Sequence, residues 1–270
     1  MSCNFAVIGV GNMAKAIISG ILKNNLPIEK IYLYDKLPIQ YNDIPDHSDL
    51  FCIADSVPNA VAEADYVLLS VKPQNYEEVL QELVLIPNRT EKVYISIGAG
   101  ITSASVSERL GGACVIRVLP NVPMFIGMGV SLICETSKAR PDDFAFVTSV
   151  FRSAGSTLII DECEMNRMIG VTSSSPAYVF QFIQSIYEGA LAQGLSDRDL
   201  LSAICDVVIG SAQLLKQSND TPKELISKVA SKGGTTEQAL QKLEENHFNE
   251  TICQAMLACT CRAEELGQIK

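Results

Sequence analysis

The sequence predicts an α/β protein with a doubly wound parallel sheet in residues 1–160 and an all-helical domain in residues 161–270. Up to Ile160, short β-branched runs alternate with helical stretches. Beyond Asp161 the β-rich runs stop, and apolar residues recur at helical spacing to the end of the chain. In addition, 270 residues are more than one compact core commonly holds, so two domains are expected.

The first domain contains six runs that are typical of strands. Several are continuously apolar without alternation, which suits strands buried on both faces of a parallel sheet. Right-handed crossovers between such strands place helices on both faces of the sheet. The runs begin at Phe5, Ile31, Tyr66, Val93, Val115 and Val130.

The second domain is predicted to hold four or five helices, because proline and glycine interrupt its helical pattern at intervals. One helix, over residues 175–193, is apolar around nearly its whole circumference. Such a helix needs cover on every side, and a domain of about 110 residues is small for that. We therefore expect a homodimer, or a higher oligomer of dimers, formed through this domain.

Composition narrows the possible partners and location. With 47% hydrophobic and 19% charged residues, the chain has the composition of a globular protein. A formal net charge of −10 repels nucleic acid and anionic membrane surfaces, so neither is an expected partner. No apolar run approaches the roughly 18–20 residues of a membrane span, and no basic leader precedes the first strand. A cytoplasmic protein is expected.

The nine cysteines predict neither a metal site nor a structural disulfide. Cys259 and Cys261 are too close in sequence for a zinc knuckle, and they have no second pair or nearby histidine. Among aliphatic neighbours a thiol behaves as a small buried hydrophobe. The cysteines in such surroundings are Cys3, Cys52, Cys114, Cys134 and Cys205.

The first strand run leads directly into the segment G-V-G-N-M-A at residues 9–14 and then into an apolar helix. In this pattern the first glycine makes a tight turn, the second lets the backbone approach a pyrophosphate, and the small last residue packs helix against strand. The helix N-terminus then holds the phosphates. A Rossmann-type dinucleotide site is predicted here, with cofactor residues Gly9, Gly11, Asn12, Met13 and Ala14.

Asp35 closes the second strand run about twenty residues beyond the glycine turn, where a carboxylate accepts hydrogen bonds from the adenosine ribose. Its charge opposes a 2′-phosphate, although the neighbouring Lys36 softens that repulsion. The expected cofactor is therefore NAD(P)H, with a weak preference for NADH.

Histidine chemistry is not favoured. The chain has two histidines, His47 and His247, and neither adjoins a strand end, so a hydroxyacid dehydrogenase with a catalytic histidine is not expected. The β-hydroxyacid dehydrogenases share this architecture, and in that family the general acid resembles a lysine on the helix that links the domains. Residues 161–194 contain no lysine, so that function would lack its general acid.

Two proline-bearing segments follow strand runs at the carboxyl edge of the sheet, where open α/β sheets bind ligands. Lys72 lies in the first of them and is a candidate catalytic residue. In the second, prolines hold Asn121 in an extended backbone, from which its amide can meet a nicotinamide ring. These segments add Val71, Lys72, Pro73 and Asn121 to the predicted cofactor site.

In the helical domain, residues 231–236 read S-K-G-G-T-T and precede a predicted helix, with Thr235 and Gln238 at capping-box spacing. Free N–H groups at this helix start, together with nearby hydroxyls, make a pocket for a small carboxylate. The predicted substrate-binding residues are Ser231, Gly233, Gly234, Thr235 and Thr236.

Taken in order, these segments resemble the pyrroline-5-carboxylate reductases over nearly the whole chain. The matching segments are G-x-G-N-M-A at 9–14, V-K-P at 71–73, a proline-flanked turn at 120–123, P-A-Y at 176–178 and the glycine-threonine segment at 231–236.

The resemblance implies reduction of the ring C=N bond of 1-pyrroline-5-carboxylate by NAD(P)H to give L-proline, the last step of proline biosynthesis. It implies that Thr236 hydrogen-bonds the ring nitrogen, while Ser231 and the N–H groups around Gly234 hold the carboxylate. It also implies that Lys72 and Asn121 line the nicotinamide. Such a reaction needs chiefly orientation and hydride delivery, because the imine can arrive protonated.

Three departures from the family pattern keep two alternatives open. Residues 172–175 read T-S-S-S where the family shows S-G-S-G, Val122 replaces a hydroxyl residue, and Lys232 replaces a proline. The first alternative is a reductase of another small cyclic imino or keto acid. The second is a regulatory or scaffold paralogue that binds dinucleotide with little catalysis.

Overall fold

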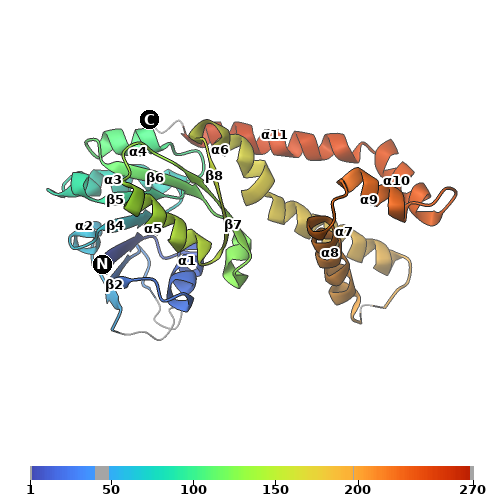
Figure 1. The fold of residues 1–270 in the computed structure, drawn as a ribbon, viewed down its shortest axis with the longest axis horizontal. Helices are drawn as coiled ribbons and strands as arrows, with labels where there is room; N and C mark the ends of the chain where they lie inside the picture. The colour runs from blue at the N-terminus through green and yellow to red at the C-terminus, as the bar shows by residue number, and fades with distance from the viewer. Residues whose placement is uncertain (1, 40–48, 197, 268–270) are drawn as a thin grey trace. The chain divides into compact units, whose positions relative to one another are not determined.

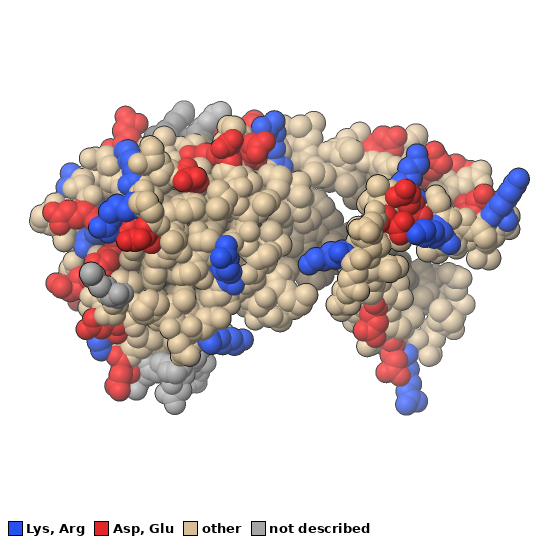
Figure 2. Space-filling view, viewed as in Figure 1, with Lys and Arg blue, Asp and Glu red and all other residues tan. Residues whose placement is uncertain are grey.

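The computed structural model describes residues 2–39, 49–196 and 198–267. The chain forms two compact units. The sheet unit comprises residues 1–174 and 256–270, and the helical unit comprises residues 175–255. Acidic and basic side chains are interspersed over the face shown in Figure 2, and much of that surface is uncharged.

The sheet unit contains one eight-stranded sheet in the order β3-β2-β1-β4-β5-β6-β7-β8 (Figure 1). All six predicted runs lie in strands, so the predicted fold class is confirmed. The strands are β1 (Cys3–Ile8), β2 (Ile28–Tyr34), β3 (Phe51–Ile53), β4 (Tyr66–Leu69), β5 (Val93–Ser96), β6 (Cys114–Leu119), β7 (Gly129–Cys134) and β8 (Gly155–Ile160).

One strand pair departs from the predicted parallel arrangement. β6 and β7 are antiparallel, whereas the other neighbouring strands pair in parallel. The two strands are joined through the short 3-10 helix η4 (Val122–Ile126). A parallel pair needs a crossover of about a dozen residues or more, so this connection is too short for one. The expectation of a purely parallel sheet is therefore wrong at this pair.

Helices cover both faces of the sheet (Figure 1). Side chains alternate along a strand, so Phe5 and Val7 of β1 face one layer while Ala6 and Ile8 face the other. The first layer is completed by α1 (Asn12–Lys23) and α5 (Pro141–Arg152). The second is completed by α2 (Val57–Val61), α3 (Tyr76–Leu83) and α4 (Ser103–Arg109).

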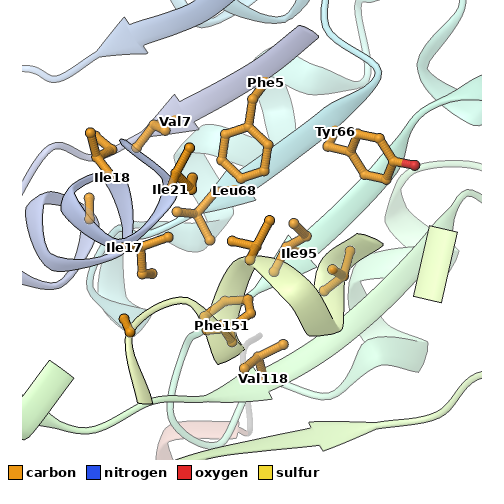
Figure 3. Close-up of a cluster of buried hydrophobic side chains, with 14 of the residues drawn as sticks. Phe5, Val7, Ile17, Ile18, Ile21, Tyr66, Leu68, Ile95, Val118 and Phe151 are labelled. Atoms are coloured by element: carbon orange, nitrogen blue, oxygen red, sulfur yellow. The ribbon is translucent and has the colours of Figure 1, made fainter. Parts of the chain in front are cut away.

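The core of the first layer is closely filled. Phe5, Ile17 and Phe151 are fully buried, and Figure 3 shows them within one cluster of apolar side chains. Burying such a side chain contributes about 1.5–3 kcal/mol. The sheet unit therefore supplies its own hydrophobic core.

The boundary between the units differs from the predicted division at residue 160. Helix α6 (Glu162–Met168) and the π-helical turn η5 (Ile169–Ser173) belong to the sheet unit. Met165 is fully buried in a cluster with Leu119, Leu132 and Ala263. Ala263 lies near the end of α11 (Phe248–Gly267), which explains why residues 256–270 also belong to the sheet unit.

A buried charge fixes α6 to the sheet. The Arg117 side chain of β6 is 1% exposed, and its Nη1 lies 3.4 Å from Glu162 Oε1. Its Nη2 donates to Asn166 Oδ1 at 2.7 Å. Glu162 in turn accepts from the Ser103 N–H at 2.6 Å. These bonds join β6 and the start of α4 to the first two turns of α6.

The helical unit contains α7 (Ser175–Ala192), α8 (Leu200–Gln217), α9 (Pro222–Val229), α10 (Thr235–Glu245) and the start of α11. The predicted helix at 175–193 ends one residue earlier than expected. Within the described residues, six α-helices follow β8, compared with the four or five predicted. The difference includes the short α6, which lies in the sheet unit.

The helical unit leaves large apolar side chains exposed in the single chain. Helix α7 has no buried residue and α8 has one, Ile204. Among described residues, α8 is also the one helix long and apolar enough to cross a membrane, and 6% of it is buried. Exposed patches of this kind mark association surfaces. The exposed side chains include Val179, Phe180, Phe182, Ile186, Leu191, Leu201, Val207, Ile209, Leu214 and Leu215.

Candidate functional site

Two joined cavities lie at the carboxyl edge of the sheet, and Ser70, Val71 and Lys72 line both. The glycine-loop cavity has a volume of about 410 Å³ and is lined also by Gly9, Gly11, residues 34–37, Asn75 and Glu82. The sheet-end cavity has a volume of about 280 Å³ and is lined also by Met13, Pro73, Gly98, Leu119, Pro120 and Ser173. Both cavities lie within the sheet unit. Together they form an extended site, as an elongated ligand requires.

The glycine loop has the geometry that phosphate binding needs. Gly9 has φ +90°, and a Cβ there would lie 2.9 Å from the Ser70 main chain, so a side chain is excluded. Around Gly11 nothing lies within 4 Å of an added Cβ, which leaves room for a ligand. Gly11 is also the N-cap of α1 and provides no side-chain cap. The first N–H groups of α1 therefore face the loop without intrahelical acceptors.

The Asp35 carboxylate fixes this loop. Oδ2 accepts from the Val10 N–H at 2.7 Å, and Oδ1 accepts from the Leu37 N–H at 3.0 Å. Sequence reasoning predicted a ribose-binding carboxylate and did not foresee the bonds to the main chain. Each oxygen keeps a second lone pair, so a ribose hydroxyl can still donate to Asp35.

Lys36 lies beside Asp35 and forms an ion pair with Glu78 of α3. The hydrogen bond that Lys36 donates to Glu78 raises the pKa of Lys36, and the charge of Glu82 adds to the effect. Glu82 also lines the glycine-loop cavity. The lysine that follows Asp35 in the sequence is therefore already paired with an acid of α3.

Ser70 provides an unsatisfied polar atom at the junction of the two cavities. Its Oγ is buried and lacks a hydrogen-bond partner within the described part of the chain. Leaving a buried hydroxyl unpaired costs about 1–3 kcal/mol, which a polar ligand atom in the cavity would relieve. Together with the open space at Gly11 and the free helix start, this residue indicates that the site fits a dinucleotide.

The buried Tyr76 hydroxyl bonds to Gly98, which lines the sheet-end cavity, and sequence reasoning did not predict this contact. It donates to the Leu69 carbonyl at 3.0 Å and accepts from the Gly98 N–H at 2.9 Å. Ser96 Oγ lies 3.1 Å away. Burial raises the pKa of Tyr76 to about 12. The hydroxyl thus holds the carboxyl ends of β4 and β5 at a fixed separation.

Asn121 makes two main-chain contacts that sequence reasoning did not foresee. Its Nδ2 donates to the Thr172 carbonyl at 2.9 Å, and its Oδ1 accepts from the Val130 N–H at 2.8 Å. The side chain is buried, with 5% of its surface exposed. Because the main chain of β7 and η5 engages both ends of the amide, Asn121 joins these two elements, and its contact with a nicotinamide stays a prediction.

Of the other predicted cofactor residues, Met13, Val71, Lys72 and Pro73 line the cavities, and Asn12 and Ala14 lie in the first turn of α1. Lys72 is exposed at the edge shared by both cavities, and Pro73 and Met13 line the sheet-end cavity. Ser173, one of the departures from the family pattern, also lines this cavity, and its Oγ donates to the Pro120 carbonyl at 3.4 Å. The extra hydroxyl is therefore accommodated in the cavity wall.

The segment 231–236 of the helical unit forms a turn that exposes a helix start. Gly233 has φ +73°, and its N–H donates to Glu237 Oε2 at 2.7 Å. Gly234 is the N-cap of α10 and lacks a side-chain cap bond. The predicted capping box of Thr235 and Gln238 is therefore wrong, because Thr235 already lies inside the helix.

The turn leaves helix N–H groups available. A Cβ on Gly234 would lie 2.5 Å from Ser231 Oγ, so this position requires glycine. The N–H groups of Thr235 and Thr236 lie in the first turn of α10, where an α-helix provides no acceptor. The local geometry therefore suits a small anion.

Histidine and cysteine add no further group to these cavities. His247 has φ +56° between α10 and α11 and is exposed, and His47 lies outside the described residues. All nine cysteines are free thiols. Of the five predicted to be buried, Cys134 is buried and the other four are half-buried. The described ranges contain no group of three or more His, Cys, Asp or Glu that could hold a metal ion.

The fold and the two cavities define a Rossmann-type dinucleotide-binding protein. A family model described as pyrroline-5-carboxylate reductase dimerisation matches residues 162–266, and one described as coenzyme F420-dependent NADP oxidoreductase matches residues 4–100. The pyrroline-5-carboxylate reductase of Escherichia coli K12 is 30% identical, over 99% of this chain and 100% of the relative. That of Vibrio alginolyticus is 33% identical, over 98% and 97% respectively. The chain belongs to the pyrroline-5-carboxylate reductase family.

Solved structures agree with this assignment. The pyrroline-5-carboxylate reductase of Coxiella burnetii has a TM-score of 0.85 and 26% identity, with 100% of both chains covered. The Plasmodium falciparum enzyme, which has NADP bound, has a TM-score of 0.89 and 24% identity, with 98% of both chains covered. The second likeness supports the fold.

Proposed function

We propose that this protein is a pyrroline-5-carboxylate reductase that reduces the C=N bond of 1-pyrroline-5-carboxylate to give L-proline, using NAD(P)H. The observation that carries this proposal is a phosphate-binding glycine loop that opens into joined cavities, in a chain that matches reductases of that name over its whole length. Such matches do not favour the alternative substrates or a regulatory paralogue.

Residues of the sheet unit would hold the cofactor, which supplies the hydride. The N–H groups from Gly11 to Ala14 would bind its pyrophosphate, with the glycine loop fixed by Asp35. Asp35 would also accept from the adenosine ribose. Lys72 would orient the reacting groups from the edge shared by both cavities. Val71 and Pro73 would complete the wall of the nicotinamide end.

Residues of the helical unit would bind the substrate. The N–H groups of Thr235 and Thr236, with the Ser231 hydroxyl, suit the carboxylate of a small imino acid. The turn at Gly233 and Gly234 exposes these donors. The Thr236 hydroxyl would hydrogen-bond the ring nitrogen and so orient the C=N bond for hydride delivery. The assignment requires an imine that is already protonated, since these groups are weak acids.

We further propose that residues 161–270 form a homodimerisation domain and that the protein acts in the cytoplasm. The family model described as pyrroline-5-carboxylate reductase dimerisation matches residues 162–266, and large apolar side chains of α7 and α8 are exposed in the single chain. The free thiols suit a reducing compartment. Homodimers or higher oligomers of dimers would cover the apolar helices.

The direct test follows oxidation of NADH and NADPH with 1-pyrroline-5-carboxylate, and separately with a panel of cyclic imines and small keto acids. We expect turnover with 1-pyrroline-5-carboxylate to exceed that with the other compounds, with L-proline as the product. Faster turnover of another compound would replace the proposed substrate. Tight cofactor binding without turnover of any compound would favour a regulatory role.

A further inference from the structure

The glycine-loop cavity contains an arrangement of charges that bears on the choice between NADH and NADPH. Its charged lining residues are Asp35, Lys36, Lys72 and Glu82. Lys36 differs from the other three because its ammonium is in direct contact with the carboxylate of Glu78. Glu78 comes from the first turn of α3, far along the chain from the end of β2.

Asp35 alone is a poor explanation of cofactor choice in this chain. Both of its oxygens accept main-chain N–H groups, from Val10 and Leu37. A change at Asp35 would therefore disturb the glycine loop as well as the charge near the ribose, and the two effects would be confounded. Lys36 is the cation closest in sequence to this carboxylate. The group that is paired with Lys36 therefore affects how strongly the site attracts a phosphate.

We propose that Glu78 is a specificity-determining residue, because its ion pair with Lys36 disfavours cofactors that carry a 2′-phosphate. This inference rests on the proposed function in taking the glycine-loop cavity as the site of the adenosine ribose. A 2′-phosphate bound there would need Lys36 as its counter-ion and would have to displace the Glu78 carboxylate. Glu82 and Asp35 would add repulsion, since both line the same cavity.

The neighbouring residue on α3 offers a matched control. Glu77 is in the same helical turn as Glu78 and also forms an ion pair, with Arg109 Nη1 at 2.7 Å. Neither glutamate lines the glycine-loop cavity itself, but Glu78 contacts Lys36, which does, whereas the partner of Glu77, Arg109, does not. Replacing either glutamate by glutamine removes one negative charge from the same helix, so a difference between the two variants isolates the contact with Lys36.

The experiment measures binding of two probes to the intact protein by calorimetry. The probes are adenosine 5′-monophosphate and adenosine 2′,5′-bisphosphate, which differ only in the 2′-phosphate. In Glu78→Gln we expect the affinity ratio to shift towards the bisphosphate by about three- to fivefold, the upper end of what an exposed ion pair contributes. Glu77→Gln should leave the ratio within about twofold of the unaltered protein. Adding Lys36→Gln to Glu78→Gln should abolish the shift.

Two results would overturn the inference. One is an equal ratio in Glu78→Gln and Glu77→Gln, and the other is a shift that persists in the double variant. Because binding is measured without substrate, neither result bears on the proposed reaction. Conversely, a shift in the ratio together with no turnover of 1-pyrroline-5-carboxylate would refute the proposed function and leave the role of Glu78 intact.

Discussion

The two units of the chain differ in how they cover their apolar side chains. In the sheet unit, Phe5, Val7 and Phe151 are fully buried in the layer that the sheet forms with α1 and α5. In the helical unit, Phe180 is 59% exposed and Val207 is 66% exposed in the single chain. The sheet unit therefore encloses its own core. The helical unit leaves apolar side chains exposed that need a partner surface to cover them.

The units also differ in how they fix their polar groups. In the sheet unit, Arg117, Tyr76 and Asn121 bond to groups far away in sequence, the last two to Gly98 and Thr172, and so hold separate elements together. In the helical unit, the capping box of Thr221 and Glu224 is an example of a local polar contact. The cavity of the sheet unit is thus preorganised by tertiary contacts, whereas the turn before α10 is shaped by its own residues.

The largest expected effect comes from placing a charge on the apolar surface of the helical unit. Phe180→Asp should dissociate the oligomer and destabilise its helices. The reason is that an unpaired carboxylate buried in the subunit interface costs roughly several kcal/mol. The control is Leu85→Asp in the sheet unit, where Leu85 is 76% exposed. That change should alter stability by about 0.5 kcal/mol or less. Sedimentation velocity and thermal melts compare the oligomeric state and the stability of the two variants. An intact oligomer in Phe180→Asp would contradict the view that the helical unit needs a partner surface and the sheet unit does not.

A smaller effect is expected from the buried charge of the sheet unit. Arg117→Ala should lower the free energy of unfolding by about 3 kcal/mol, since it leaves Glu162 and Asn166 without their partner. Arg167→Ala is the control, because Arg167 is 68% exposed and pairs with Glu164 only at 4.0 Å. Surface pairs of that kind contribute about 0–1 kcal/mol. Urea unfolding that gave equal losses for the two variants would contradict the role of Arg117.

The variant Tyr76→Phe tests how much the tertiary hydrogen bonds of the sheet unit stabilise it. Losing the hydroxyl leaves the Gly98 N–H without its acceptor, although the Leu69 carbonyl still accepts from the Ile97 N–H, so we expect a loss of about 1–3 kcal/mol at pH 7. Cofactor affinity should fall as well, because the ends of β4 and β5 would be less well fixed.

The same variant predicts a pH dependence. The pKa of Tyr76 is about 12 in the folded protein and ordinarily 10.0, so its stabilisation is complete below pH 10 and is lost as the pH rises towards 12. The difference in unfolding free energy between the unaltered protein and Tyr76→Phe should therefore narrow between pH 9 and about pH 11. A difference that widens over that range would show that Tyr76 ionises more readily in the folded state.

The smallest effect on stability is expected at Thr236 in the helical unit. Gly234 is the N-cap of α10, so Thr236→Ala removes no capping bond and should change the melting temperature little. If the hydroxyl binds the substrate nitrogen, kcat/KM should fall tenfold or more, as roughly expected for a hydrogen bond to a charged partner together with lost orientation. Thr235→Ala is the control on the same turn. Unchanged kinetics in Thr236→Ala would remove Thr236 from the proposed site.

Local patterns in the sequence determined much of this protein. The continuous apolar runs predicted β1, β2, β4, β5, β6 and β7, because a strand buried on both faces needs such a run. The glycine loop followed equally directly, since only glycine tolerates φ +90° beside Ser70 at position 9. The apolar circumference of α7 predicted that this helix cannot be covered within one chain.

Tertiary structure decided which polar groups meet. The sequence placed Asp35 and Asn121 at strand ends, but only the fold showed that Val10, Thr172 and Val130 engage their side chains. It gave no indication that the hydroxyl of Tyr76 supports two strand ends, because an aromatic residue on an amphipathic helix fits a purely apolar role equally well. The contact of Lys36 with Glu78 likewise joins residues forty-two positions apart. Periodicity reports which face of an element is buried, whereas the partners of a polar group depend on how distant elements pack, and that is set by the whole fold.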